Sequence, residues 1–222
     1  MGKFDHRRGE RSSRKYGFKE PRANSFLIVS EGEETEPIYF NSFGRIIKDT
    51  VGGNIETIKI PYLTIEGKGR STIQLLSEVE KIVSKSKIIY QNIWILFDKD
   101  QFEDFDEAVK LGKDKGYCVA WSNYCFEYWL TLHFNYCDAA LDSNALQESL
   151  SKIYKRLGIA GEYSKNDPNV FENVGGIEGV KRAVKNAKRR MSEFKETTSP
   201  SSFNPGTKVY VLAEKLLSYI EE

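Results

Sequence analysis

The sequence lacks any run of apolar residues close to the roughly 20 that a membrane-spanning helix needs. Its first residues are polar and basic, and they include no apolar segment of the kind found in a secretory signal. Cysteine is scarce, and the three cysteines are an odd number that cannot pair completely. We therefore expect a cytoplasmic protein with free thiols and no membrane partner, and a disulfide-stabilised secreted domain is excluded.

Two motifs that would indicate a cofactor are incomplete. The segment GKGRS at 67–71 lacks the full G-x-x-x-x-G-K-[ST] pattern, so nucleoside triphosphate binding is not expected as the main activity. Cys118, Cys125, His133 and Cys137 match no common four-ligand zinc spacing. The pattern favours buried cysteines and a hydrogen-bonded histidine over a zinc site.

Charge is nearly balanced over the 222 residues but unevenly distributed. The net charge is +1, while residues 1–22 carry eight Lys or Arg and three Asp or Glu, which leaves +5 in this segment. Such an arm is suited to binding a phosphate backbone through Arg7, Arg8, Arg11 and Arg14. A solvated terminal tail explains the same composition, and both interpretations stay open.

Hydrophobic periodicity predicts alternating strands and helices in the first 121 residues. Strands are expected at 25–30, 56–63, 91–97 and 116–121, with helices at 35–48, 71–84 and 105–113. The remaining segments with helical spacing are 126–134, 145–157, 177–194 and 207–220. This order predicts an α/β protein with a mainly parallel sheet of about four strands flanked by helices. The expected divisions are a basic arm (1–22), an α/β core (23–135) and a helical C-terminal part (136–222).

Acidic residues follow two of the predicted strands. Glu31 comes directly after the first strand, and Asp98 and Asp100 follow the apolar run IWILF. Ligands of parallel α/β sheets bind at the carboxyl ends of the strands, so these acids meet if the two strands are neighbours. Two carboxylates two residues apart in an extended chain face the same side, and a hard cation relieves their repulsion. The pattern predicts a Mg²⁺ or Mn²⁺ site that Glu31, Asp98 and Asp100 form.

Four segments resemble motifs of the RloB-like family, in the family's order. They are FLIVSEGEETEPIYF at 26–40, FDKD at 97–100, SNYCFEYWLTLHF at 122–134 and NPGTKVY at 204–210. The likeness extends from about residue 22 to residue 217. One departure is visible, because the third motif usually has proline where this chain has Tyr124, and the loop conformation there is expected to differ.

The resemblance implies a Toprim-like fold related to the catalytic domains of topoisomerases, primases and OLD-type nucleases. The acids that such a site uses correspond here to Glu31, Asp98 and Asp100. The family motifs also make Glu36 a secondary candidate, for a second metal or for supporting the first. Glu127 is a secondary candidate in the same way, although a structural ion pair explains a carboxylate in an apolar helix equally well.

The resemblance further implies a role in bacterial defence loci, in which an ATPase is sometimes encoded nearby. Our first hypothesis is a metal-dependent nuclease of an anti-phage system that acts on DNA or RNA. We expect neither strand passage, which needs a tyrosine nucleophile on a separate domain, nor primer synthesis, which needs a nucleotide site. The alternative is a non-catalytic nucleic-acid-binding or sensor subunit that depends on a partner ATPase.

The helix expected at 177–194 has an apolar stripe and a basic remainder. Its cations Lys181, Arg182, Lys185, Lys188 and Arg189 would suit a nucleic-acid backbone, and Lys165 in a polar loop could also reach a phosphate. A solvated outer helix face is the usual explanation of such a charge pattern. The sequence leaves these two interpretations open.

Overall fold

The computed structural model describes residues 19–51, 54–59, 72–100, 102–159, 161–195 and 199–220. Its central sheet has the strand order β2-β1-β3-β4-β5. Four strands run parallel: β1 (Glu20–Ser30), β2 (Asn54–Lys59), β3 (Ile88–Asp98) and β4 (Cys118–Asn123). The two-residue β5 (Gly206–Thr207) pairs antiparallel with β4. The predicted α/β class, with about four mainly parallel strands, is confirmed.

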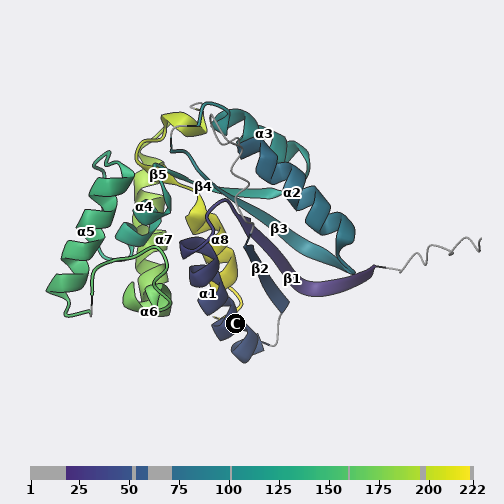
Figure 1. Cartoon of the computed structure of the whole chain (residues 1–222), viewed down its shortest axis with the longest axis horizontal. Coiled ribbons are helices and arrows are strands. Elements are labelled where there is room, and N and C mark those ends of the chain that lie inside the picture. The colour runs from purple at the N-terminus through teal and green to yellow at the C-terminus, as the bar shows by residue number, and fades with distance from the viewer. Residues whose placement is uncertain are drawn as a thin grey trace, which may run out of the picture.

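A helix follows each of the four parallel strands, and helices make up most of the C-terminal part (Figure 1). The first group comprises α1 (Thr35–Val51), α2 (Thr72–Lys85) and α3 (Phe105–Asp114). The second comprises α4 (Phe126–Leu132), α5 (Ser143–Arg156), α6 (Val170–Asn173), α7 (Gly176–Ser192), the 3₁₀ turn η1 (Pro200–Ser202) and α8 (Val209–Leu217). Among the described residues, no helix combines the length and the apolar character that a bilayer crossing requires.

Both faces of the sheet are covered, as expected for parallel strands that are apolar without interruption. Successive side chains of β1 point to opposite faces. Phe26 and Ile28 belong to a core cluster with residues of α1, α4, α7 and α8, whereas Leu27 and Val29 pack with residues of α2 and α3. Figure 1 shows α2 and α3 together on one side of the sheet and α1 and α8 on the other. This burial fixes the register of β1, because a one-residue slip would exchange the two faces.

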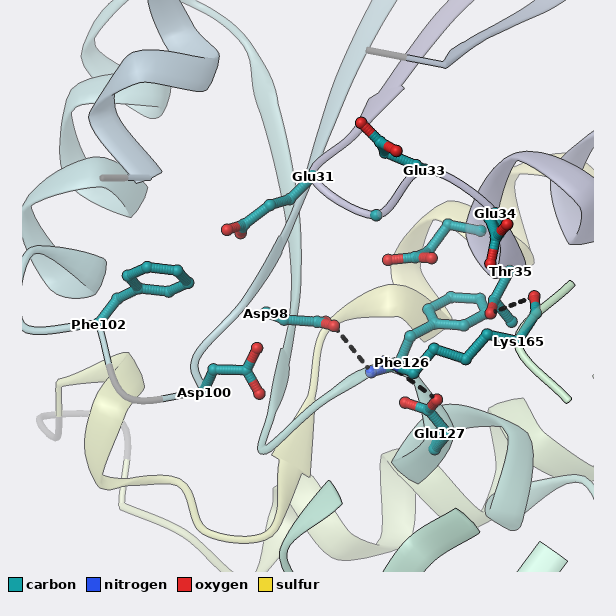
Figure 2. Close-up of a pocket in the computed structure, with 12 residues that line it drawn as sticks. Glu31, Glu33, Glu34, Thr35, Asp98, Asp100, Phe102, Phe126, Glu127 and Lys165 are labelled. Atoms are coloured by element: carbon teal, nitrogen blue, oxygen red, sulfur yellow. Dashed lines mark hydrogen bonds and ion pairs between the residues drawn. The ribbon is translucent and has the colours of Figure 1, made fainter. Parts of the chain in front are cut away.

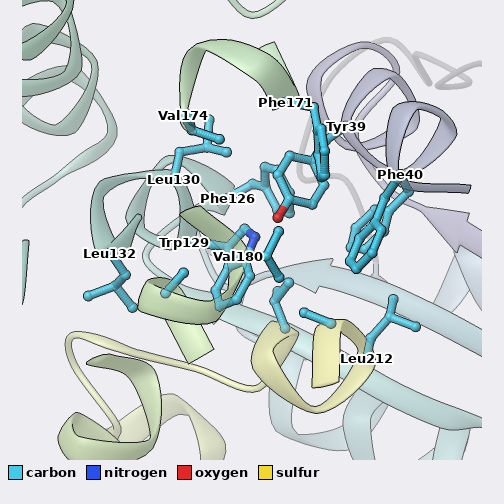
Figure 3. Packing of buried hydrophobic residues seen from close by; sticks show 14 of the residues in the cluster. Tyr39, Phe40, Phe126, Trp129, Leu130, Leu132, Phe171, Val174, Val180 and Leu212 are labelled. Carbon is cyan, nitrogen blue, oxygen red and sulfur yellow. The ribbon is translucent and has the colours of Figure 1, made fainter. Parts of the chain in front are cut away.

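The helical C-terminal part shares the larger core cluster with the α/β core (Figure 3). His133 is buried there, with Nε2 2.9 Å from the Tyr39 hydroxyl and Nδ1 3.0 Å from the Trp129 carbonyl oxygen. Burial lowers the pKa of His133 to about 3, so the ring is neutral and joins α1 to α4. The prediction of a hydrogen-bonded histidine is confirmed.

The expectation for the cysteines holds only in part. Cys125 is buried and Cys137 is half-buried, but Cys118 is exposed. The reason is its position, because Cys118 is the first residue of β4 and lies away from β5, which pairs only with Ser122 and Asn123. All three are free thiols, as predicted.

Several element boundaries differ from those expected from the sequence, and two of the differences have a clear reason. β1 begins at Glu20, five residues before the predicted strand, and its register with β3 shifts between Arg22 and Phe26. Thr207, predicted to begin a helix, lies in β5 and donates its hydroxyl to the Trp121 carbonyl oxygen at 2.9 Å. The polar start of β1, before the register shift, is too short to show periodicity. The same holds for the two-residue β5.

We predict that Gly179→Ala destabilises the protein by about 1–3 kcal/mol, because overpacking of a core is costly. A Cβ at Gly179 in α7 would lie 2.2 Å from the carbonyl oxygen of Val174, and backbone cannot swing aside as a side chain can. Urea denaturation would measure the loss. Lys185→Ala, on the exposed face of the same helix, is the control and should leave the midpoint nearly unchanged. An unaltered midpoint for Gly179→Ala would contradict this close approach.

Candidate functional site

A cleft of about 290 Å³ opens where β1 and β3 end. The two strands are neighbours, with Ser30 opposite Leu96, and the Glu31 N–H donates to the Leu96 carbonyl oxygen at 3.1 Å. Glu31 and Asp98 therefore leave the sheet at the same edge. The condition on which the predicted acidic site depended, adjacency of these two strands, is met.

Carboxylates dominate the lining of this cleft. Seven acidic residues line it, namely Glu31, Glu33, Glu34, Glu36, Asp98, Asp100 and Glu127. Lys165 is the one basic residue among the described residues that line it. Figure 2 shows Glu31 and Asp100 on one side, Glu127 and Lys165 on the other, and the Asp98 carboxylate between them. With every carboxylate ionised, seven negative charges and one positive charge leave a formal charge of −6.

Backbone geometry at the end of β3 presents the two aspartates. An oxygen of Asp98 accepts from the Phe126 N–H at 3.1 Å, at the start of α4. Asp100 lies in a turn with φ of 37°, a left-handed conformation that Asp adopts more readily than most residues. Its N–H donates to the Tyr124 carbonyl oxygen at 3.0 Å. Both aspartates line the cleft, but a turn brings Asp100 there and not the continued extended strand that the sequence argument assumed.

The loop that contains Tyr124 also orders this turn. The Asn123–Tyr124 peptide bond is cis, at the position where the related motif usually has proline. The Lys99 N–H donates to the Ser122 carbonyl oxygen at 2.9 Å, one residue before that bond.

Glu36 occupies space in the cleft that is free because Gly32 has no side chain. A Cβ added at Gly32 would lie 2.2 Å from both carboxylate oxygens of Glu36, so any side chain there would displace this acid. Glu36 is buried in the first turn of α1. Burial, with a smaller contribution from the charge of Glu127, raises the pKa of Glu36 to about 7, although backbone hydrogen bonds and Lys165 act in the opposite direction. The carboxyl therefore exchanges its proton near neutral pH.

The helical C-terminal part completes the cleft. Glu127, in α4, is buried and accepts from the Tyr163 hydroxyl at 3.1 Å. The Lys165 ammonium lies 3.6 Å from the same Glu127 oxygen. Ser143, at the start of α5, donates to Asp100 at 3.4 Å. The α/β core alone would thus leave both Glu127 and Asp100 without these partners.

Burial and mutual repulsion disfavour ionisation of the two aspartates. Burial raises the pKa of Asp98 well above its ordinary value, and neighbouring charges add to this rise. The charges come from Glu36, Asp100, Glu127 and Glu31. Burial also raises the pKa of Asp100, although Lys165 and the Ser143 hydroxyl act in the opposite direction. A bound cation would remove this electrostatic cost.

The residues present fit a divalent metal by donor type. Carboxylate oxygens are the ligands that Mg²⁺ and Mn²⁺ prefer, and several converge here in a cleft that is open to solvent. Within the described ranges, however, no three His, Cys, Asp or Glu side chains are arranged so that they could hold a metal ion as they stand. Glu31, Asp98 and Asp100 thus line one cleft without forming a finished ligand set, and their side chains would have to turn to hold a shared ion.

The basic residues expected to bind nucleic acid are dispersed. Arg7, Arg8, Arg11 and Arg14 lie outside the described residues. Lys165 lines the cleft, whereas Lys181, Arg182, Lys185, Lys188 and Arg189 are on α7 and do not line it. Several of the α7 cations have local partners: Lys181 pairs with Glu178, Arg182 donates to the His133 carbonyl oxygen, Lys188 pairs with Glu214, and Arg189 stacks on Tyr136. Their nucleic-acid role stays a prediction.

Three residues at the cleft escaped the sequence argument. Tyr163 and Ser143 contact the acids from segments far along the chain, and nothing local to them signals this role. Thr35, the first residue of α1, also lines the cleft, and its hydroxyl donates to the Lys165 carbonyl oxygen at 2.7 Å. The polar segment at 164–169 was the sequence signal nearest to these contacts.

Comparison with known proteins gives one match. A family model described as RloB-like protein matches residues 26–216, most of the chain. No curated protein and no solved structure matches.

We predict that Glu36→Gln stabilises the metal-free protein at pH 8 but not at pH 4.5. A carboxyl with a raised folded-state pKa loses stabilisation as pH rises from its ordinary value of 4.5 to about 7. The glutamine has no charge to bury, so the gain at pH 8 is up to roughly 3 kcal/mol. Urea denaturation in a chelator would measure it, with the exposed neighbour Glu34→Gln as control. Equal stability of Glu36→Gln and wild type at pH 8 would contradict the conclusion that burial raises the pKa of Glu36.

Proposed function

This chain belongs to the RloB-like protein family, and we propose that it is a divalent-metal-dependent phosphodiester hydrolase, a nuclease. The observation that supports the proposal is the cleft in which, among the described residues, seven carboxylates and the Lys165 ammonium form the charged lining. No polyanion approaches such a surface unless cations neutralise it first. The location agrees with the general rule that ligands of parallel α/β sheets bind at the carboxyl ends of the strands.

In the proposed mechanism, Glu31, Asp98 and Asp100 hold the ion. Mg²⁺ or Mn²⁺, when bound, supplies a water molecule of lowered pKa and positive charge for the phosphate oxygens. The Phe126 N–H holds Asp98 in orientation, and the Ser143 hydroxyl does the same for Asp100. Glu31 is the candidate general base if it does not ligate the ion. Glu36, with a pKa of about 7, can hold or release a proton at its carboxylate near neutral pH.

We infer the biological role from the family resemblance. It favours an anti-phage defence system of bacteria, with DNA or RNA as substrate and an ATPase as a potential partner. Strong nuclease activity would harm the host, so dependence on such a partner is consistent with the same chemistry. The experiment below tests the metal and the substrate with this protein alone.

We predict that Asp98→Asn lowers cleavage roughly 100-fold or more, the scale of losing one electrostatic stabiliser of a transition state. The change is nearly isosteric, and the amide can still accept from the Phe126 N–H, so the loss would come from charge. Single- and double-stranded DNA and RNA would be incubated with wild type and variant in Mg²⁺ or Mn²⁺. Calorimetry with the same metals would follow binding.

The matched control is Asp114→Asn, an exposed aspartate at the end of α3 that does not line the cleft. It should leave both metal binding and cleavage unchanged. Metal binding by wild type without cleavage would indicate that a partner must activate the protein. Cleavage that Asp98→Asn leaves intact would contradict the proposed site.

A further inference from the structure

Lys165 occupies an unusual position for a lysine. It is the one cation among the described residues that line the cleft, and the lining also includes seven carboxylates. Its side chain is 53% exposed, whereas that of its partner Glu127 is 3% exposed. The ammonium thus has one side on a buried acid and the other toward the open cleft.

The backbone of Lys165 is fixed by a hydrogen bond, whereas its ammonium has an ion pair with Glu127. Its carbonyl oxygen accepts from the Thr35 hydroxyl at 2.7 Å, which ties the loop to the first residue of α1. Two residues earlier, Tyr163 is buried, its N–H donates to the Ser151 hydroxyl at 3.2 Å, and its ring packs on Tyr154. A long flexible side chain on a fixed backbone can move its charge without any rearrangement of the fold.

The pairing with Glu127 is loose enough to be exchanged. The 3.6 Å separation is longer than a good charge-assisted hydrogen bond of about 2.7–2.9 Å. The same Glu127 oxygen already accepts from the Tyr163 hydroxyl at 3.1 Å. Glu127 would therefore keep a hydrogen-bond donor if the ammonium left.

We propose that Lys165 is the internal counter-ion of the cleft in the metal-free protein, and that metal binding releases its ammonium to contact the substrate phosphodiester. The proposal rests on the proposed function, because it presumes a metal and a nucleic-acid substrate at this cleft. A divalent cation and the ammonium compete for the same negative charge, and two cations close together repel. The released side chain points to the open cleft, where the phosphate of the bound strand would lie.

Competition between the metal ion and the Lys165 ammonium predicts a result that a purely structural role of Lys165 does not. Removing the ammonium should strengthen metal binding, because the ion no longer displaces a resident charge. If Lys165 only supported the local structure, its removal would loosen the carboxylates and weaken metal binding. The sign of the change in metal affinity therefore separates the two roles.

The test uses the full chain with Lys165→Met, which keeps the apolar stem, and Lys165→Arg, which keeps the charge. Lys152→Met is the matched control, an exposed lysine of α5 that pairs with Glu148 and does not line the cleft. Calorimetry at low ionic strength measures Mn²⁺ affinity. Fluorescence anisotropy measures binding of single-stranded phosphorothioate DNA and RNA oligonucleotides, in EDTA and in saturating Mn²⁺.

We expect Lys165→Met to bind Mn²⁺ about tenfold more tightly than wild type, a conservative figure for removing one nearby charge at a partly exposed site. Mn²⁺ should strengthen oligonucleotide binding much less in this variant than in wild type. Lys165→Arg should resemble wild type in metal affinity, and Lys152→Met should do so in both measurements.

Equal or weaker Mn²⁺ binding by Lys165→Met would overturn the counter-ion role. Tighter Mn²⁺ binding with an unchanged effect of Mn²⁺ on oligonucleotide binding would overturn the contact with phosphate. Failure of the proposed function is distinguishable, because the measurement on wild type would then show no Mn²⁺ binding. In that case both proposals would be wrong.

Discussion

The parallel pairing of β1 with β3 is the constraint on which the rest of the site depends. It brings the ends of two strands that are far apart in sequence to one edge of the sheet. Burial on both faces fixes the pairing, since β1 contributes Phe26 and Ile28 to one core cluster and Leu27 and Val29 to the other. A one-residue slip of β1 would exchange its side chains between these two differently packed faces. The core therefore determines where Glu31 and Asp98 emerge.

The site concentrates negative charge at a cost that the fold must offset. Burial and like charges raise the pKa of Asp98, Asp100 and Glu36 together, so each ionisation makes the next less favourable. Lys165 and the hydrogen bonds from Phe126, Ser143 and Tyr163 relieve part of the repulsion. Structures that serve stability alone rarely gather several carboxylates in one partly buried cleft, whereas perturbed acids in a cleft are typical of functional sites.

Features that are local in sequence could be predicted, and those that depend on distant contacts could not. Glu31 and Asp98 could be predicted from the sequence because each acid directly follows the apolar run of a strand. Asp100 was identified for a geometric reason that the structure replaces with a left-handed turn. Tyr163 and Ser143 could not be found, because they meet the acids only after the helical part packs on the sheet. The irregular start of β1 and the two-residue β5 carry no periodic signal.

The most direct test of the central claim is calorimetry of Mn²⁺ binding by wild type near pH 6.5, repeated in buffers with different enthalpies of ionisation. A metal that binds carboxyls with raised pKa values must displace protons from them. The proposed site therefore predicts binding accompanied by net proton release, and less release at pH 8, above the Glu36 pKa of about 7. Absence of Mn²⁺ binding, or binding without proton release at pH 6.5, would contradict the carboxylate site.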